Sequence, residues 1–157
     1  MPIIASTHIE AFPFRRVPGG LEFLLLLRRQ DSTIGGTWQP VFGAIEAGET
    51  SPQAALRELR EETGLTPIGF WQVEGVDMFY MARIDTVTVC PCFAVEVAPD
   101  ARVTISDEHS DHCWLDTEAM LRETLWPGQR RAVREIVTEI ARPGPAEPLL
   151  RIAPPPK

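Results

Sequence analysis

Three carboxylate side chains stand close together in one short segment, at Glu58, Glu61 and Glu62. On a helix that turns about 100° per residue, these three side chains share an arc of about 100°. Like charges at such spacings repel by a few tenths of a kcal/mol per pair. A hard divalent cation would offset this repulsion, and oxygen-only ligands suit Mg²⁺ or Mn²⁺ better than zinc. The spacing therefore indicates a metal site on a helix. A solvated helix face, balanced by Arg57 and Arg60, is the alternative.

The helix that must position these acids is predicted over Pro52–Thr63. Ser51 can cap its first turn, Pro52 suits the first helical position, and Gly64 suits the left-handed residue after its end. An apolar face lies beside the acids, made by Ala55, Leu56, Leu59 and Thr63. We expect the helix to bury that face and to present the acids next to it.

The residues around the acids resemble the signature of the Nudix hydrolases, Gly-x5-Glu-x7-Arg-Glu-(apolar)-x-Glu-Glu-x-Gly-(apolar). The positions that match are Gly43, Glu49, Arg57, Glu58, Leu59, Glu61, Glu62, Gly64 and Leu65. The resemblance has no departure within this segment, and it implies the α/β/α Nudix fold over about residues 1–142.

The resemblance also implies a role for each of these residues. Glu58 and Glu62 match the principal metal-binding acids, Glu61 a further ligand, and Gly43 a position whose backbone carbonyl often joins the metal shell. Arg57 and Glu49 match residues that hold the acids in place. The implied cofactor is Mg²⁺, with Mn²⁺ as a substitute, bound against the pyrophosphate of a nucleotide-like substrate.

Longer segments resemble one branch of the family, the pyrophosphohydrolases of dihydroneopterin triphosphate and of deoxynucleoside triphosphates such as dATP. The segments are WQPVFGAIEAGETSPQAALRELREETGL, DEHSDHCWLD and WPGQRRAVREI. In that branch an acid before the last strand can supply another metal ligand, and Glu108 matches it; a solvated loop acid is the alternative. Many family members have Pro-Gly-Gly where this chain has Val41-Phe42-Gly43, and the dihydroneopterin-like branch departs similarly.

Four further residues are candidates for binding the substrate. Arg28 and Arg29 close an apolar strand and can bind phosphate bidentately, although surface ion pairs fit them as well. Trp38 can stack on a base, and Tyr80 lies near the position of a tyrosine in diadenosine polyphosphate hydrolases. A core position suits either aromatic residue equally. The spacing of Cys90, Cys92, His112 and Cys113 fits no common zinc site and indicates reduced thiols.

Composition narrows the class of protein. The chain has 157 residues, 15 basic and 22 acidic, for a net charge of −7. This balance argues against a nucleic-acid binder, and no apolar run approaches the roughly 18 residues that span a bilayer. The N-terminus lacks the pattern of a signal peptide, and three cysteines do not suggest a disulfide framework. A cytoplasmic protein is expected. Both a monomer and a homodimer stay open.

Strand and helix signals alternate along residues 1–142, which predicts one α/β domain with a mixed sheet between helices. The strands are expected at Ile3–Ala11, Phe14–Val17, Glu22–Arg29, Trp38–Phe42, Ile68–Ala82, Thr86–Val97 and Cys113–Leu115. A second helix is expected over Gly128–Ala141. Residues 143–157 are rich in proline and are expected to form an extended or disordered tail. Docking of this tail through Leu149, Leu150 and Ile152 is the alternative.

These observations predict a metal-dependent pyrophosphohydrolase that cleaves a nucleoside or pterin triphosphate to a monophosphate and pyrophosphate. A diadenosine polyphosphate hydrolase is the alternative within the same family. A nucleotide-binding sensor that has the fold without turnover is the alternative from another class. The complete set of acids at Glu58, Glu61 and Glu62 favours an enzyme.

Overall fold

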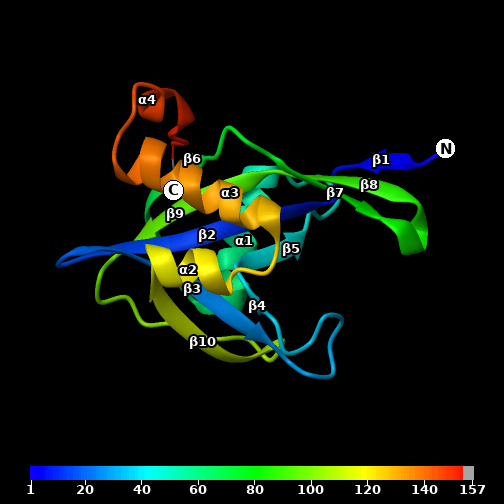
Figure 1. Ribbon diagram of the computed structural model, residues 1–157, viewed down its shortest axis with the longest axis horizontal. Helices are drawn as coiled ribbons and strands as arrows, with labels where there is room; N and C mark the ends of the chain where they lie inside the picture. Colours follow the sequence, from blue (N-terminus) through cyan, green and yellow to red (C-terminus); the bar gives the residue numbers. More distant parts are fainter. Residues whose placement is uncertain (154–157) are drawn as a thin grey trace.

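The larger of two β-sheets forms the centre of the protein (Figure 1). A computed structural model describes residues 1–153. The strands of this sheet are β2 (His8–Val17), β3 (Gly20–Arg28), β4 (Trp38–Gln39), β5 (Val41–Ala44), β6 (Pro67–Gln72), β9 (Cys92–Val97) and β10 (His109–Asp116). Their order is β10-β3-β2-β9-β6, with β4 beside β3 and β5 beside β2. Because β2 is parallel to β9 and antiparallel to β3 and β5, the sheet is mixed, as predicted.

A smaller sheet extends from one side of the larger one (Figure 1). It contains β1 (Ile3–Ala5), β7 (Asp77–Met81) and β8 (Thr86–Cys90), in the order β1-β8-β7. The boundaries predicted for Ile68–Ala82 and Thr86–Val97 were wrong, because each of these β-rich segments contains two strands and not one. Each of these segments divides between the two sheets. Pro91 separates β8 from β9 because it has no N–H for a sheet hydrogen bond.

Helices cover both faces of the larger sheet, which confirms the α/β/α architecture. The helix α1 (Ser51–Thr63) packs on one face, and α2 (Thr117–Glu123) and α3 (Pro127–Glu135) pack on the other. The apolar run of β3 serves both cores, since Phe23 and Leu25 join one buried cluster while Leu24 and Leu26 join the other. A strand covered on both sides accounts for such an unbroken run.

The cap of α1 differs from the predicted one. The Thr50 side chain, not Ser51, accepts a hydrogen bond from the Gln53 backbone N–H, and the Gln53 side chain accepts one from the Thr50 N–H. This reciprocal pair is a capping box. Gly64 ends the helix in the predicted left-handed conformation, with φ of 68°.

The C-terminal part of the chain contains more helix than predicted. The helix α2 was not predicted, although Asp116 caps it by accepting from the Ala119 N–H at 2.8 Å. The helix expected over Gly128–Ala141 is present as α3, followed by the π-helical turn η2 (Ile136–Ala141). No helix within residues 1–153 is long and apolar enough to cross a membrane.

The tail differs from the extended segment that its prolines suggest. It forms the short helix α4 (Glu147–Leu150), and Leu150 is buried while Leu149 stays exposed. The Trp71 indole N–H donates to Glu147 at 2.6 Å, and the Ile152 N–H donates to the Phe70 carbonyl at 2.8 Å. The tail therefore docks on the edge strand β6. Its last four residues, 154–157, lie outside the described part of the chain.

The position of the α1 cap yields a stability prediction. Thr50→Ala removes the oxygen that accepts from Gln53, so the free energy of unfolding should fall by about 1 kcal/mol. Ser51→Ala is the matched control and should change it by less than about 0.5 kcal/mol. Urea denaturation measures both values, and a larger loss for Ser51→Ala would contradict this cap assignment.

Candidate active site

Glu62 is the acid of α1 that faces the sheet. It is only 4% exposed, and its carboxylate accepts a hydrogen bond from the Phe42 backbone N–H on β5. Its Oε2 atom has no hydrogen-bond partner among the described residues. Burial, reinforced by the charges of Glu58 and Glu108, raises the pKa of Glu62 to about 8. We expected all three acids to lie beside the buried face of the helix. Glu62 instead belongs to that buried face.

Glu58 lies one helical turn earlier and packs against the backbone of β5. A Cβ atom placed on Gly43 would overlap the Glu58 carboxyl group, so only glycine leaves room for it here. Burial raises the pKa of Glu58, the contact with Arg57 opposes this, and the charges of Glu61 and Glu108 add to it. A side chain at position 43 would therefore displace the Glu58 carboxyl group from this place.

Arg57 is the cation that connects these acids. Its Nε and Nη2 atoms donate to the two carboxylate oxygens of Glu49 at 2.9 and 3.0 Å. Its Nη1 atom donates to Glu58 at 2.8 Å and to Glu61 at 3.1 Å. The Arg57 hydrogen bonds, with the Glu46 N–H, lower the pKa of Glu49, and Glu49 and Glu58 in turn raise the pKa of Arg57. This bidentate arrangement fits the positioning role that the resemblance implies for Arg57 and Glu49.

Glu108 lies in a loop that is attached to the end of α1. The Thr104 N–H donates to the Thr63 carbonyl at 2.8 Å, and the Ser106 N–H donates to the Glu62 carbonyl at 3.3 Å. The Glu108 carbonyl accepts from the Arg29 N–H at 3.2 Å. These contacts keep an exposed carboxylate near Glu58 and Glu62, and its charge contributes to raising the pKa of both.

The carboxylate oxygens of Glu58, Glu61, Glu62 and Glu108 are ligands of the kind that a hard divalent cation prefers. Two carboxylates with raised pKa values, Glu58 and Glu62, lie between β5 and the last turns of α1, and one oxygen of Glu62 is buried without a partner among the described residues. Within residues 1–153 no three acid, histidine or cysteine side chains are already gathered at one point as in a finished metal site. Glu58 and Glu61 instead contact Arg57. A cation would therefore draw these carboxylates together, and their mutual repulsion favours its binding.

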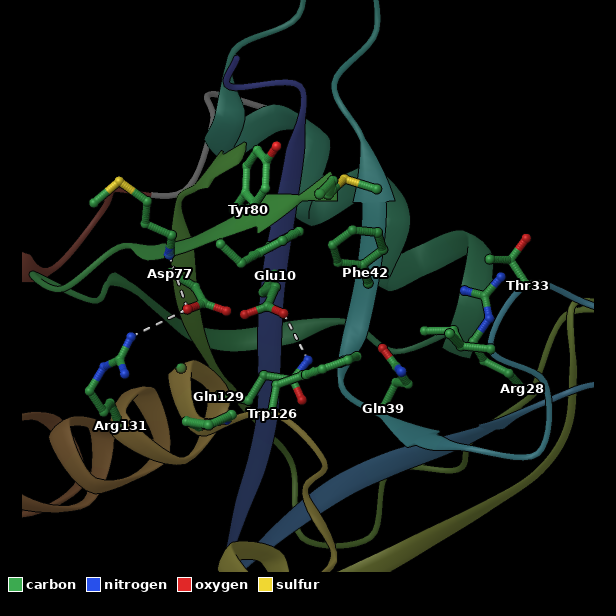
Figure 2. A pocket seen from close by; sticks show the side chains of 16 residues that line it. Glu10, Arg28, Thr33, Gln39, Phe42, Asp77, Tyr80, Trp126, Gln129 and Arg131 are labelled. Carbon is green, nitrogen blue, oxygen red and sulfur yellow. Dashed lines mark hydrogen bonds and ion pairs between the residues drawn. The ribbon is translucent and has the colours of Figure 1, made fainter. Parts of the chain in front are cut away.

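A cavity of about 540 Å³ lies on the other face of β5 (Figure 2). Its walls are mostly apolar, and they include Phe42, Met78, Phe79, Tyr80, Met81 and Trp126. Its polar lining includes Glu10, Arg28, Gln39, Asp77, Gln129 and Arg131. An apolar cavity with a few convergent polar groups is typical of a small-molecule site.

The structure brings together only part of the predicted substrate-binding set. Arg28 and Tyr80 line the cavity, and Tyr80 is exposed, with its hydroxyl donating to Asp85 at 2.8 Å. Arg29 is exposed beside Asp31, and Trp38 packs against the core formed with α2 and α3. Neither lines the cavity.

Sequence reasoning missed the polar floor of the cavity. Glu10 is 2% exposed, and the Gln129 side-chain N–H donates to it at 2.8 Å. Burial raises the pKa of Glu10 to about 7, helped by the charge of Asp77 and opposed by the bond from Gln129. An acid between Ile9 and Ala11 in an otherwise apolar strand was the available signal. Its partner lies 119 positions away along the chain, so sequence alone did not identify the pair.

Comparison with known proteins places the chain in a family. The NUDIX domain model matches residues 11–136, which includes β5, α1 and the Glu108 loop. The chain belongs to the Nudix hydrolase family. This match confirms the resemblance to the Nudix hydrolases that the segment around the acids shows.

The relatives of this chain carry different names. The chain is 32% identical over 132 residues to dihydroneopterin triphosphate diphosphatase of Escherichia coli, which covers 75% of the chain and 84% of that protein. It is 35% identical over 100 residues to the mouse asymmetrical bis(5'-nucleosyl)-tetraphosphatase, which covers 62% of the chain and 66% of that protein. It is 38% identical over 122 residues to a Myxococcus xanthus protein named octanoyltransferase, where the match covers 73% of the chain. That match spans 32% of the named protein, about a third of its length.

Solved structures confirm the Nudix fold. A C. elegans Ap4A hydrolase complex aligns with a TM-score of 0.75 at 21% identity, covering 88% of this chain and 99% of that one. The E. coli dihydroneopterin triphosphate pyrophosphohydrolase aligns with a TM-score of 0.70 at 25% identity, with the same coverage of 88% and 99%.

The raised pKa of Glu10 yields a prediction for this Nudix protein. Between its ordinary value of 4.5 and about 7, the folded state holds a proton that the unfolded state has released. The free energy of unfolding should therefore fall as the pH rises through this window, by up to about 3 kcal/mol from this group. Glu10→Gln cannot titrate, so its unfolding free energy should fall less over the same range. Denaturation at several pH values measures this, and equal slopes would contradict it.

Proposed function

We propose that the chain hydrolyses a phosphoanhydride bond in a nucleoside or pterin triphosphate, releasing a monophosphate and pyrophosphate. The position of β5 between cavity and acids carries this proposal. The Phe42 side chain lines the cavity while its N–H binds Glu62, and the next residue, Gly43, packs against Glu58. A head group held in the cavity would therefore place its phosphates at the acid helix.

The acid residues have the chemistry to hold the cofactor. We assign Glu58, Glu61, Glu62 and Glu108 as carboxylate ligands, with the Gly43 carbonyl as a further donor. Arg57 and Glu49 orient them through the contacts described above. When bound, Mg²⁺ or Mn²⁺ would neutralise phosphate oxygens and lower the pKa of a bound water. Five acids, counting Glu49, against Arg57 and Arg28 leave a local negative excess that a divalent cation suits.

Arg28 is the residue best placed to bind phosphate. It lines the cavity, its charge lowers the pKa of Glu62, and its Nε atom is buried without a partner in the described chain. A guanidinium at this junction can bind phosphate oxygens and align the bond to be cleaved. Water then attacks phosphorus as the bond to the bridging oxygen breaks, and pyrophosphate leaves. Tyr80, which lines the cavity, remains a proposed contact of the substrate, whereas Arg29 and Trp38 do not line the cavity and remain proposals from the sequence alone.

A diadenosine polyphosphate hydrolase is the second candidate. Tyr80, Phe42 and Trp126 offer aromatic surface in one cavity, enough to stack on a base. Relatives named as bis(5'-nucleosyl)-tetraphosphatases match this chain at 35% identity. For either activity we propose a cytoplasmic enzyme, because its three cysteines are free thiols.

A substrate panel with Mg²⁺ tests the proposed function. Nucleoside triphosphates and dihydroneopterin triphosphate should yield a monophosphate and pyrophosphate, with diadenosine tetraphosphate cleaved much more slowly. Chromatography of the products measures this. A better kcat/KM for diadenosine tetraphosphate, with ATP and AMP as products, would favour the second candidate. Binding without turnover across the panel would instead indicate a sensor.

Replacing one buried ligand tests the metal assignment. Glu62→Gln keeps the shape but removes a ligand charge, so kcat should fall by several orders of magnitude while the fold is kept. EDTA should abolish activity of the unchanged protein, and Mg²⁺ or Mn²⁺ should restore it. Near-native activity of the variant with Mg²⁺ would contradict the assignment.

The loop acid Glu108 has matched controls in its own loop. If it completes the metal site, Glu108→Gln should lower kcat by about 10- to 10³-fold. Its unfolding free energy should change by less than about 0.5 kcal/mol, because the side chain is exposed. Asp107→Asn and Asp111→Asn remove the same charge from neighbouring positions and should retain activity. Equal small losses in all three variants would remove Glu108 from the site.

A further inference from the structure

The floor of the cavity holds a polar group that the proposed hydrolysis does not use. Glu10 on β2 and Gln129 on α3 are 2% and 1% exposed, and a hydrogen bond of 2.8 Å joins them. Asp77 on β7 lies beside them and is 7% exposed. Figure 2 shows Glu10 between Asp77 and Phe42, with the Gln129 amide directed at it. Among residues 1–153, no hydrogen bond or ion pair joins any of the three to Arg57 or to the acids of α1.

This floor offers hydrogen-bond acceptors with few donors to meet them. Within residues 1–153, Glu10 Oε2 accepts a hydrogen bond only from the Cys92 thiol, at 3.7 Å. Gln129 donates a side-chain N–H to Glu10, and the Gln129 Oε1 atom is buried without a partner among residues 1–153. Asp77 accepts from the Met78 N–H at 3.0 Å and, at a long 3.4 Å, from Arg131. Buried acceptors of this kind favour a ligand that brings donors.

The walls restrict that ligand to a flat, largely apolar ring system. Phe42, Tyr80 and Trp126 line the cavity above and around the floor (Figure 2). Aromatic side chains favour stacking with a heteroaromatic ring. A ring held between them would turn one edge toward Glu10. Because burial raises the pKa of Glu10 to about 7, donors on that edge would also stabilise its charged form.

Heteroaromatic head groups differ in what this edge carries. The 2-amino-4-oxo pattern, shared by guanine and pterin, places a ring N–H and an exocyclic amine side by side, and both donate. Adenine places an unprotonated ring nitrogen beside its amine. That nitrogen is an acceptor, so it would repel the ionised Glu10 carboxylate and could pair only with the protonated form, which is lost above a pH of about 7.

We propose that Glu10, with Gln129 and Asp77, selects head groups of the 2-amino-4-oxo class over adenine. This inference rests on the proposed function, because it assigns the head group of the same substrate. It makes Glu10 a specificity-determining residue that lies apart from the metal-binding acids. It also predicts that adenine nucleotides are poor substrates.

Hydrolysis of dGTP and dATP compares the two patterns on the same sugar and phosphates. With Mg²⁺, kcat/KM for dGTP should exceed that for dATP by at least about tenfold. Glu10→Gln replaces one acceptor by a donor, so it should remove most of this preference, chiefly by raising KM for dGTP while kcat is kept. Glu118→Gln removes an acid at an exposed position of α2 and should leave the preference unchanged. Should Glu10→Gln not fold, Asp77→Asn provides the same comparison.

Binding without turnover separates this inference from the proposed function. Calorimetry with dGMP and dAMP, without metal, should show tighter binding of dGMP to the unchanged protein and a loss of that difference in Glu10→Gln. This result would support the selection even if no triphosphate were hydrolysed. Equal or tighter binding of dAMP, or an unchanged preference in Glu10→Gln, would overturn it even for an active enzyme.

Discussion

The structure depends on one guanidinium group among several carboxylates. Arg57 donates to Glu49, Glu58 and Glu61 at distances between 2.8 and 3.1 Å. A single positive charge cannot neutralise all of these acids together with Glu62 and Glu108, so the cluster keeps a negative excess. Burial, together with this negative excess, raises the pKa of both Glu58 and Glu62. Arg57 thus holds Glu49, Glu58 and Glu61 in place, while the cluster as a whole keeps its negative charge.

The strand β5 carries this arrangement to the cavity. Its residue Gly43 has no side chain, which allows Glu58 to pack against it, and Phe42 uses its backbone for Glu62 and its ring for the cavity wall. The same short strand therefore contacts the acids of α1 on one side and a mostly apolar cavity on the other. Figure 2 shows Arg28 at the end of the cavity opposite Arg131. The charge of Arg28 lowers the pKa of Glu62. A substrate that spans both parts would be held by its two chemically different ends.

The sequence predicted those parts of the fold that depend on the local spacing of residue types. The acid helix, its left-handed end at Gly64 and the doubly covered strand Phe23–Leu27 follow from periodicity and from residue type. The burial of Glu62 could not be predicted from the helix alone, because it depends on how closely β5 approaches. Glu10 and Gln129 meet across 119 positions, so no local pattern shows their contact. Proline content indicated a loose tail, yet Leu150 and the Trp71–Glu147 hydrogen bond supply the contacts that dock it.

Mn²⁺ binding, followed by electron paramagnetic resonance without substrate, tests the central claim that the acids of α1 form one cation site. The free ion gives a signal that is lost on binding, so affinity is obtained without any reference to turnover. We expect Glu62→Gln to weaken Mn²⁺ binding by at least about tenfold, while Glu118→Gln binds like the unchanged protein. Equal Mn²⁺ affinity in the unchanged protein and in Glu62→Gln would contradict the account.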